Sequence, residues 1–284
     1  MKGTEMSKLK KALEKAKETR EHKSLTAING DQKHQKLKEP ISGNLKECKS
    51  ELNVTYTETK INKIDDRILK KGKVISLFHD TEKIDQIKTL RTMVLNKLEE
   101  LGGKSLLVTS ANPYEGKTFT AINLGVSIAQ ELDRTVLLVD CDLKDHSYHH
   151  KSFSKDFFGT QMNEGLSNYL LGQAELPELL INPGIERLVL LPAGRTLPNS
   201  AEMLGSPKME MLVNDIKCRY PSERIIIFDS PSLLGSADPL ILSRYVDGIL
   251  LIVEEEKTTM ADLNRAMELL KNKPVLGTVL NKSK

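Results

Sequence analysis

Six short apolar runs recur along the chain after its first third, and helical patterns separate them. The runs are as long as β-strands and lack polar alternation: 105–109, 135–139, 187–191, 224–228, 248–253 and 275–280. Strands covered on both faces by helices show such continuous apolar runs. No hairpin signal joins these runs, so their order predicts βαβ units. We therefore expect an α/β fold with a mostly parallel sheet and helices on both faces.

The segments around these runs carry helical spacing. The helix expected over 83–101 is amphipathic, and Gly102-Gly103 follows its last apolar residue as a stop signal. The other expected helices cover 118–131, 165–171, 201–220, 239–244 and 260–272.

A phosphate-binding loop follows the first of these strands. Residues 111–118 read Ala-Asn-Pro-Tyr-Glu-Gly-Lys-Thr, which is the pattern G-x-x-x-x-G-K-[ST] with Ala as its first residue. The amides of such a loop and of the helix after it point at anionic oxygens. Gly116 permits close backbone approach, Lys117 is expected to reach the β- and γ-phosphates, and the Thr118 hydroxyl is expected to hold Mg²⁺. The flanking strand and helix favour a P-loop NTPase fold over a chance Gly-Lys-Thr.

Carboxylates end two further strands. Asp140 and Asp142 follow the second run, and Asp229 follows the run 224–228. In an open parallel sheet the ligand lies beyond the carboxyl ends of the strands. Beside a nucleotide these side chains are expected to order Mg²⁺ and its waters, or to accept a proton from an attacking hydroxyl. Capping of the next helix is the structural alternative for Asp140 and Asp142.

Charge divides the chain into two parts. Residues 1–75 hold 19 Lys/Arg and 11 Asp/Glu, a net charge of +8, and residues 76–284 have a net charge of −5. The first part also has few large apolar groups, which predicts a weakly ordered tail or linker. A docking segment for a partner or an anionic membrane surface is the functional alternative. We expect 76–284 to form the folded domain.

Several classes of protein do not fit the composition. The longest apolar runs, such as 249–253, are far shorter than the roughly 18 residues of a membrane span. No apolar stretch follows the lysine-rich N-terminus, so a signal peptide is not expected. Cys48, Cys141 and Cys218 form no paired motif, which argues against structural zinc and favours a reducing compartment. We therefore expect a cytoplasmic protein.

In these motifs the sequence resembles the bacterial tyrosine kinases of exopolysaccharide export. That family carries a Walker A loop, a Walker A′ strand ending D-x-D and a Walker B strand ending in Asp, which here read A-N-P-Y-E-G-K-T, V-L-L-V-D-C-D and I-I-I-F-D-S-P. The resemblance covers about residues 80–284. It is greatest to the branch associated with PEP-CTERM/exosortase loci, through stretches such as Leu191-Pro192-Ala193-Gly194 and Phe228-Asp229-Ser230-Pro231.

The resemblance implies a protein-tyrosine autokinase with ATP and Mg²⁺ as cofactors. It assigns catalysis to Lys117, Asp140 and Asp142, and the metal to Thr118, Asp140 and Asp229. The nucleotide is expected to contact Asn112, Glu115, Gly116, Lys117, Thr118, Phe119 and Asn281. Asn281 matches an Asn that contacts adenine in the wider ATPase class.

The family also has an E-x-x-R-x-x-R helix motif for ring-like self-assembly. Here the helix reads Asp85-x-x-Lys88-x-x-Arg91. Spacings of three residues bring the charges near one helix face, where they could meet a neighbouring subunit. A solvated helix face is the alternative. Because Lys cannot replace Arg in a bidentate contact, a weaker ring is expected.

Three departures affect the expected function. Walker A′ in the family continues D-x-D-x-R-x-P, where this chain has Lys144 and His146, and Ser232 replaces the second Pro after Walker B. The histidines at 146, 149 and 150 are read as an exposed loop rather than a metal site. No tyrosine cluster ends the chain, whose last tyrosine is Tyr245. The acceptor is therefore an isolated tyrosine or another protein, or the chain turns over ATP unproductively.

Three functions remain open. The first is a tyrosine kinase of exopolysaccharide export that forms homo-oligomers, needs a separate membrane co-polymerase as activator, and binds no nucleic acid. Such a kinase would be cytoplasmic and reach the inner membrane through that partner. The second is an ATPase switch of the chromosome-partitioning or division-site type. That class has a signature Lys where this chain has Asn112, and glycines where it has Pro113-Tyr114, so the kinase is favoured. The third is a regulatory subunit that binds nucleotide only to assemble.

Overall fold

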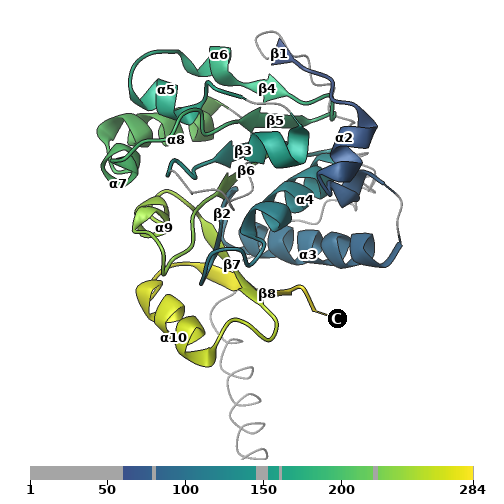
Figure 1. Ribbon diagram of the computed structural model, residues 1–284, viewed down its shortest axis with the longest axis vertical. Helices are drawn as coiled ribbons and strands as arrows, with labels where there is room; N and C mark the ends of the chain where they lie inside the picture. The colour runs from purple at the N-terminus through teal and green to yellow at the C-terminus, as the bar shows by residue number, and fades with distance from the viewer. Residues whose placement is uncertain (1–59, 79–80, 145–152, 160–161, 220–222, 284) are drawn as a thin grey trace, which may run out of the picture. The chain divides into compact units, whose positions relative to one another are not determined.

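One eight-stranded sheet organises the part of the chain that the structure describes. The computed structural model describes residues 60–78, 81–144, 153–159, 162–219 and 223–283. The strand order is β1-β4-β5-β3-β6-β2-β7-β8 (Figure 1). The strands are β1 (Lys60–Ile61), β2 (Ser105–Ser110), β3 (Thr135–Asp140), β4 (Ile181–Asn182), β5 (Leu188–Leu191), β6 (Arg224–Asp229), β7 (Gly248–Glu254) and β8 (Val275–Asn281).

All six apolar runs of the sequence are strands of this sheet, and the predicted fold class is confirmed. Neighbouring strands are parallel at every pairing except one. The exception is β4 with β5, where Ile181 lies opposite Leu190 in an antiparallel pair. β4 is only two residues long, which is too short to leave an apolar run in the sequence.

Helices connect the strands and cover the sheet. Short turns of 3₁₀ and π type add to them at η1 (Ile75–Leu77) and η2 (Phe153–Phe157). The α-helices are α2 (Asp66–Lys71), α3 (Thr81–Glu100), α4 (Lys117–Ala129), α5 (Leu166–Leu170), α6 (Leu176–Leu179), α7 (Ser200–Leu204), α8 (Pro207–Arg219), α9 (Asp238–Leu242) and α10 (Met260–Leu269).

The two faces of the sheet carry separate apolar cores. Alternate strand residues point to opposite faces, so Leu107 belongs to one core while Leu106 and Val108 belong to the other. Helices α8, α9 and α10 contribute to the first core, and α3 and α4 to the second. Every residue of β2 and β3 is buried. Burial on both faces explains why these strands lack polar alternation.

The single helix expected over 201–220 is two helices, and that prediction was wrong in this respect. α7 ends before Gly205, and α8 begins at Pro207. Proline has no N–H to donate and disfavours helical backbone in the residue before it. The same properties suit proline to the first position of a helix, so the chain stops and restarts at this point.

The folded domain begins before residue 76, which differs from the boundary that the sequence predicts. Residues 60–78 form β1, α2 and η1, and the side chains of Leu69 and Val74 are buried in the core that includes α4. Asp65 caps α2 by accepting a hydrogen bond from the amide of Arg67 at 2.7 Å. The sequence signal for folded structure in residues 60–75 is weak, because many lysines stand among the apolar residues of this stretch. Residues 1–59, the rest of the predicted tail, lie outside the described residues.

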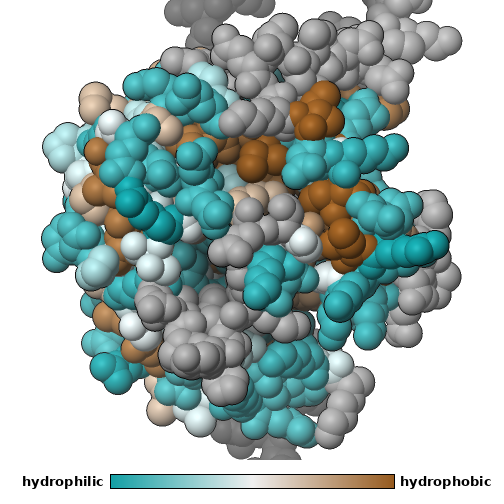
Figure 2. All heavy atoms as spheres, turned by 45° about the horizontal axis from the view of Figure 1, so that its top comes forward, coloured by the Kyte–Doolittle hydropathy of each residue, from teal (hydrophilic) through white to brown (hydrophobic). Residues whose placement is uncertain are grey.

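One face of the molecule mixes apolar and hydrophilic side chains. On the face that Figure 2 shows, brown apolar residues form small groups between teal hydrophilic ones. No helix in the described residues is long and apolar enough to cross a bilayer.

We predict that Leu69→Ala lowers the free energy of unfolding by about 2–4 kcal/mol, because the change leaves a cavity in the core. Urea unfolding followed by circular dichroism measures this value. Ile61→Ala is the matched control, since Ile61 is 66% exposed, and its effect should stay within about 0.5 kcal/mol. Equal effects of the two variants would show that residues 60–75 do not belong to the core.

Candidate active site

The carboxyl ends of three adjacent strands bring the predicted site residues together. β3, β6 and β2 lie side by side in the sheet. Asp140 at the end of β3 pairs in register with Asp229 at the end of β6, and Asp229 pairs with Val108 of β2. The phosphate loop follows β2 directly. The two strand-end carboxylates and the loop therefore share one edge of the sheet, as the sequence predicts.

The loop turns into α4 at Gly116, which adopts a left-handed conformation with φ 96°. A side chain at this position would be strained by the backbone and would also collide with a neighbour. Its Cβ would lie 2.0 Å from Nδ2 of Asn281 at the end of β8. Only glycine fits, and the loop can then direct its amides and the start of α4 toward an anion.

Glu115 braces the loop from within. Its carboxylate is buried and accepts hydrogen bonds from the amide of Asn112 at 2.9 Å and from the hydroxyl of Thr258. Thr258 also accepts a hydrogen bond from the amide of Glu254 at 2.8 Å. Glu115 thus joins the loop to the segment that follows β7. The buried carboxylate of Glu115 makes both of these hydrogen bonds. No pattern in the sequence indicates that Thr258 takes part.

The end of β8 holds the loop from outside. Nδ2 of Asn281 donates a hydrogen bond to the carbonyl of Glu115 at 2.8 Å, and Nζ of Lys282 donates to the carbonyl of Tyr114 at 2.8 Å. Lys282 also forms an ion pair with Glu254 at 2.9 Å. Asn281 therefore lies at the phosphate loop, and its predicted contact with adenine stays a prediction.

Lys117 and Thr118 begin α4 beside the Walker B carboxylate. Both side chains are buried, as is Asp229. Burial raises the pKa of Asp229 to about 7, against the opposing effects of the Lys117 charge and of a hydrogen bond from Thr118. The structure thus places a lysine and a hydroxyl group against one carboxylate, which is the arrangement that the phosphate-loop pattern predicts.

Three carboxylates crowd this edge of the sheet. Burial raises the pKa of Asp140 well above its usual range, and the charges of Asp229 and Asp142 raise it further. The amide of Asp142 donates to Oδ1 of Asp140 at 3.0 Å, which holds the two residues together. Oδ1 of Asp229 is buried without a hydrogen-bond partner in the structure. Such repulsion and an unsatisfied buried oxygen are relieved by a cation, so these residues fit Mg²⁺.

The described residues do not form a cage that could hold a metal ion alone. Among them, no group of three or more His, Cys, Asp or Glu side chains is arranged for that purpose. Mg²⁺ is usually held by one or two carboxylates together with waters and substrate phosphates. The site therefore suits an ion that binds together with a nucleotide. The predicted histidine loop, 146–150, lies outside the described residues.

Two sets of predicted residues have other contacts in the structure. The side chain of Phe119 packs against the core shared by α3 and α4. On α3, Asp85 pairs with Lys88 at 3.5 Å. Arg91 pairs with Glu131 at 3.0 Å and donates to the carbonyl of Ser127 at 2.8 Å. Arg91 thus links α3 to the last turn of α4 and to Glu131, which follows that helix, within the same chain.

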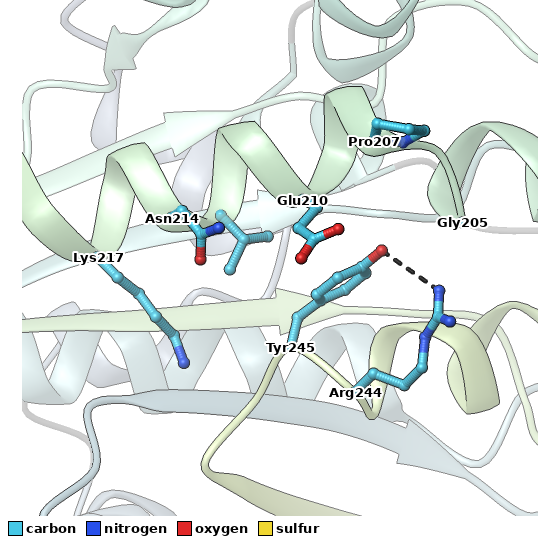
Figure 3. Close-up of a pocket in the computed structure, with 8 residues that line it drawn as sticks. Gly205, Pro207, Glu210, Asn214, Lys217, Arg244 and Tyr245 are labelled. Atoms are coloured by element: carbon cyan, nitrogen blue, oxygen red, sulfur yellow. Dashed lines mark hydrogen bonds between the residues drawn. The ribbon is translucent and has the colours of Figure 1, made fainter.

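A cavity of about 390 Å³ lies apart from this edge of the sheet. α8 and the turn before β7 line it, and it includes none of the predicted site residues (Figure 3). In the close-up, Tyr245 and Arg244 lie beneath α8, and the Arg244 guanidinium donates to the Tyr245 hydroxyl at 3.4 Å. The Tyr245 hydroxyl also donates to the carbonyl of Leu204 at 3.3 Å. Its lining offers no acidic cluster or phosphate loop.

Comparisons with known proteins show a family of relatives and a shared fold. No protein-family model matches the chain. Tyrosine-protein kinase YwqD of Bacillus subtilis is 33% identical over 203 residues, which cover 70% of this chain and 81% of that protein. The kinase domain of Escherichia coli tyrosine kinase ETK has the same fold, with a TM-score of 0.66, 23% identity and coverage of 81% and 92%. The structure of MinD of Pyrococcus horikoshii with Mg-ADP has a TM-score of 0.51 and 22% identity, and the match covers 64% of this chain and 72% of that chain.

We predict that Asp229→Asn stabilises the metal-free protein increasingly as pH rises. The native carboxyl keeps its proton up to about pH 7, whereas an unfolded one loses it near pH 4. Unfolding between these values releases a proton, so wild-type stability falls with rising pH, by at most about 1.4 kcal/mol per pH unit. The Asn variant lacks this loss.

Urea unfolding in EDTA at pH 5, 6, 7 and 8 measures the difference between variant and wild type. Glu268→Gln, which changes an exposed carboxylate on α10, is the control and should show a constant difference. A difference between Asp229→Asn and wild type that does not change with pH contradicts the prediction.

Proposed function

The chain belongs to the bacterial tyrosine-protein kinase family, and on this premise we propose that it transfers the γ-phosphoryl group of ATP to tyrosine in proteins. Support comes from its 33% identity to YwqD across 81% of that protein. The observation that carries the proposal is the meeting of Lys117, Thr118 and three carboxylates at the carboxyl ends of β3 and β6.

In this proposal the phosphate loop binds ATP through backbone amides and the start of α4. Gly116 lets the backbone approach the phosphates, and Glu115 keeps the loop in shape through Asn112 and Thr258. Lys117 directs its ammonium group at the β- and γ-phosphates. Its charge stabilises the negative charge that spreads over the transferred oxygens. Asn281 would contact the nucleotide, which its hydrogen bond to the loop supports.

The carboxylates would hold the metal ion and take up the proton. Thr118 and Asp229 would hold Mg²⁺ together with Asp140, through oxygen atoms or bound waters. Bound Mg²⁺ would neutralise phosphate charge. Asp142 is the candidate that accepts the proton of the attacking tyrosine hydroxyl, since its carboxylate follows the same strand end as Asp140. Thr118 and Asp140 would therefore act on the metal, and Asp142 on the substrate.

The cellular setting of the kinase is also part of the proposal. The motif matches favour exopolysaccharide synthesis or export, in the branch associated with PEP-CTERM loci. The activator would be a separate membrane co-polymerase, through which the kinase reaches the inner membrane from the cytoplasm. The basic N-terminal region predicted from the sequence, residues 1–75, would add attraction to an anionic leaflet. The acceptor would be a tyrosine of another protein or an isolated tyrosine of this chain.

Self-assembly into a homo-oligomer would involve the exposed start of α3. The side chains of Asp85 and Lys88 are 76% and 49% exposed, so a neighbouring subunit could contact them. Arg91 is mostly buried against Glu131 and Ser127. Arg91 could join such an interface only if these contacts broke. This cost supports a weakly associated ring.

An ATPase switch is the second candidate function, and the structural similarity to MinD favours it. The loop itself speaks against it. Asn112 replaces the signature Lys of that class, and its backbone amide donates a hydrogen bond to the Glu115 carboxylate. Pro113-Tyr114 stand in place of glycines. A regulatory subunit that binds nucleotide without phosphoryl transfer is the third candidate.

We predict that Lys117→Met abolishes phosphotyrosine on the protein and on its partners. Loss of the ammonium group removes charge stabilisation during transfer, which should lower the rate by about 100-fold or more. Mass spectrometry of the wild-type and variant chains, each purified from the native host, measures phosphotyrosine and its position together.

Lys271→Met is the matched control, because Lys271 is exposed on the turn after α10, and it should leave phosphotyrosine unchanged. The kinase proposal would be contradicted by wild-type protein that hydrolyses ATP but has no phosphotyrosine and forms none on other proteins. That result would favour the switch if ATP also causes dimerisation, and the regulatory subunit if it does not.

A further inference from the structure

A fully buried carboxylate lies outside the set of residues that the proposed chemistry uses. Asp238 begins α9, and its side chain has no exposed area. Its Oδ2 accepts a hydrogen bond from the Ser200 hydroxyl at 2.8 Å, at the start of α7. Its Oδ1 faces Nζ of Lys144 at 3.7 Å and has no hydrogen bond. A buried carboxylate with one neutral donor requires a cation nearby, and Lys144 supplies it.

Lys144 belongs to the segment that carries the Walker A′ carboxylates. It stands two residues after Asp142, where the family pattern has Arg. Its Nζ also donates to the Ser236 hydroxyl at 2.9 Å, and that hydroxyl accepts from the amide of Asp238 at 3.1 Å. The lysine therefore binds both ends of a short segment, 236–238, in the loop that follows Walker B.

Two backbone hydrogen bonds also hold the Walker A′ segment, beside the buried side chains of Cys141 and Leu143. The amide of Cys141 donates to the carbonyl of Asp229 at 2.8 Å, and the carbonyl of Leu143 accepts from the amide of Leu197 at 2.7 Å. These bonds fix the path of the main chain on two sides. The Lys144 side chain adds a further attachment shortly after Asp142, through an ion pair with Asp238.

The loop after Walker B is itself attached to the start of the phosphate loop. The amide of Leu233 donates to the carbonyl of Ser110 at 2.8 Å, and the amide of Leu234 donates to the carbonyl of Ala111 at 3.1 Å. Lys144 thus joins the Walker A′ segment to the loop after Walker B, which is in turn bonded to the start of the phosphate loop. A shift in any of the three would move the carboxylates relative to Lys117.

We propose that Lys144 and Asp238 form a positioning pair that sets Asp140 and Asp142 relative to Asp229 and the phosphate loop for binding of Mg·ATP. The proposal rests on the proposed nucleotide site, though not on phosphoryl transfer. Neither residue touches the nucleotide in this account, and both act through the Walker A′ segment. Residues that orient metal-binding groups affect metal affinity by about 10–100-fold.

The test measures how the binding of a fluorescent ATP analogue depends on Mg²⁺. Full-length wild type, Lys144→Met, Lys144→Arg and Asp238→Asn are titrated with MgCl₂ at a fixed analogue concentration, and with the analogue in EDTA. The Mg²⁺ concentration for half-maximal binding should rise about 10-fold or more in Lys144→Met and Asp238→Asn. Lys144→Arg, which keeps the charge, should stay within threefold of wild type, as should the control Lys271→Met.

Two further readouts separate positioning from general stability. Affinity in EDTA should stay within twofold of wild type in every variant, because the phosphate loop is unchanged. In the double variant Lys144→Met/Asp238→Asn the loss should not exceed the larger single loss, because the two residues act as one unit. If Asp238→Asn does not fold, the two Lys144 variants decide, since the Lys144 side chain is 34% exposed and Lys144→Arg keeps a charge beside Asp238.

An unchanged Mg²⁺ requirement in Lys144→Met would overturn the proposal, as would single losses that multiply in the double variant. Loss of binding in EDTA as well as in Mg²⁺ would show a merely structural pair and overturn it too. These outcomes are distinct from failure of the proposed kinase function, because wild type without any phosphotransfer would still show the Mg²⁺ dependence measured here.

Discussion

Burial of the neighbouring carboxylates Asp140 and Asp229 is the constraint on which the site depends. The pKa of Asp140 is raised by burial and by the charges of both other residues, and Asp229 leaves an oxygen without a hydrogen bond. A protein core does not keep such a group without compensation. Lys117 and Thr118 supply part of it, and a divalent cation with a nucleotide would supply the rest. Stability is thus lowered at the place where the ligand binds.

The surrounding contacts keep these charges at fixed positions. The phosphate loop is held by Glu115, which bonds Asn112 and Thr258, and by Asn281 at the end of β8. On the other side of the site, Lys144 joins the Walker A′ segment to Asp238. These contacts come from loops that are far apart in sequence and close together at one edge of the sheet. A parallel sheet makes this possible because all its carboxyl ends meet there.

The sequence predicts the fold well, and it predicts the contacts around the candidate site poorly. Strands buried on both faces leave continuous apolar runs, so all six were found, and Lys117, Thr118 and the strand-end carboxylates lie where their motifs place them. Contacts such as Glu115 with Thr258 join residues 143 positions apart, and no local pattern encodes them. The break in the helix at Pro207 was readable, whereas the buried Leu69 stands in a lysine-rich stretch that resembles a linker.

A crystal structure of the chain with Mg²⁺ and a non-hydrolysable ATP analogue tests the central claim most directly. The account predicts Mg²⁺ about 2.1 Å from the Thr118 hydroxyl and from phosphate oxygens, with Asp229 and Asp140 coordinating it directly or through water. Lys117 should contact the β- and γ-phosphates, and Asp142 should face the γ-phosphate. A nucleotide bound away from the loop at 111–118, or a metal ion with none of the three carboxylates in or next to its coordination shell, would contradict the account.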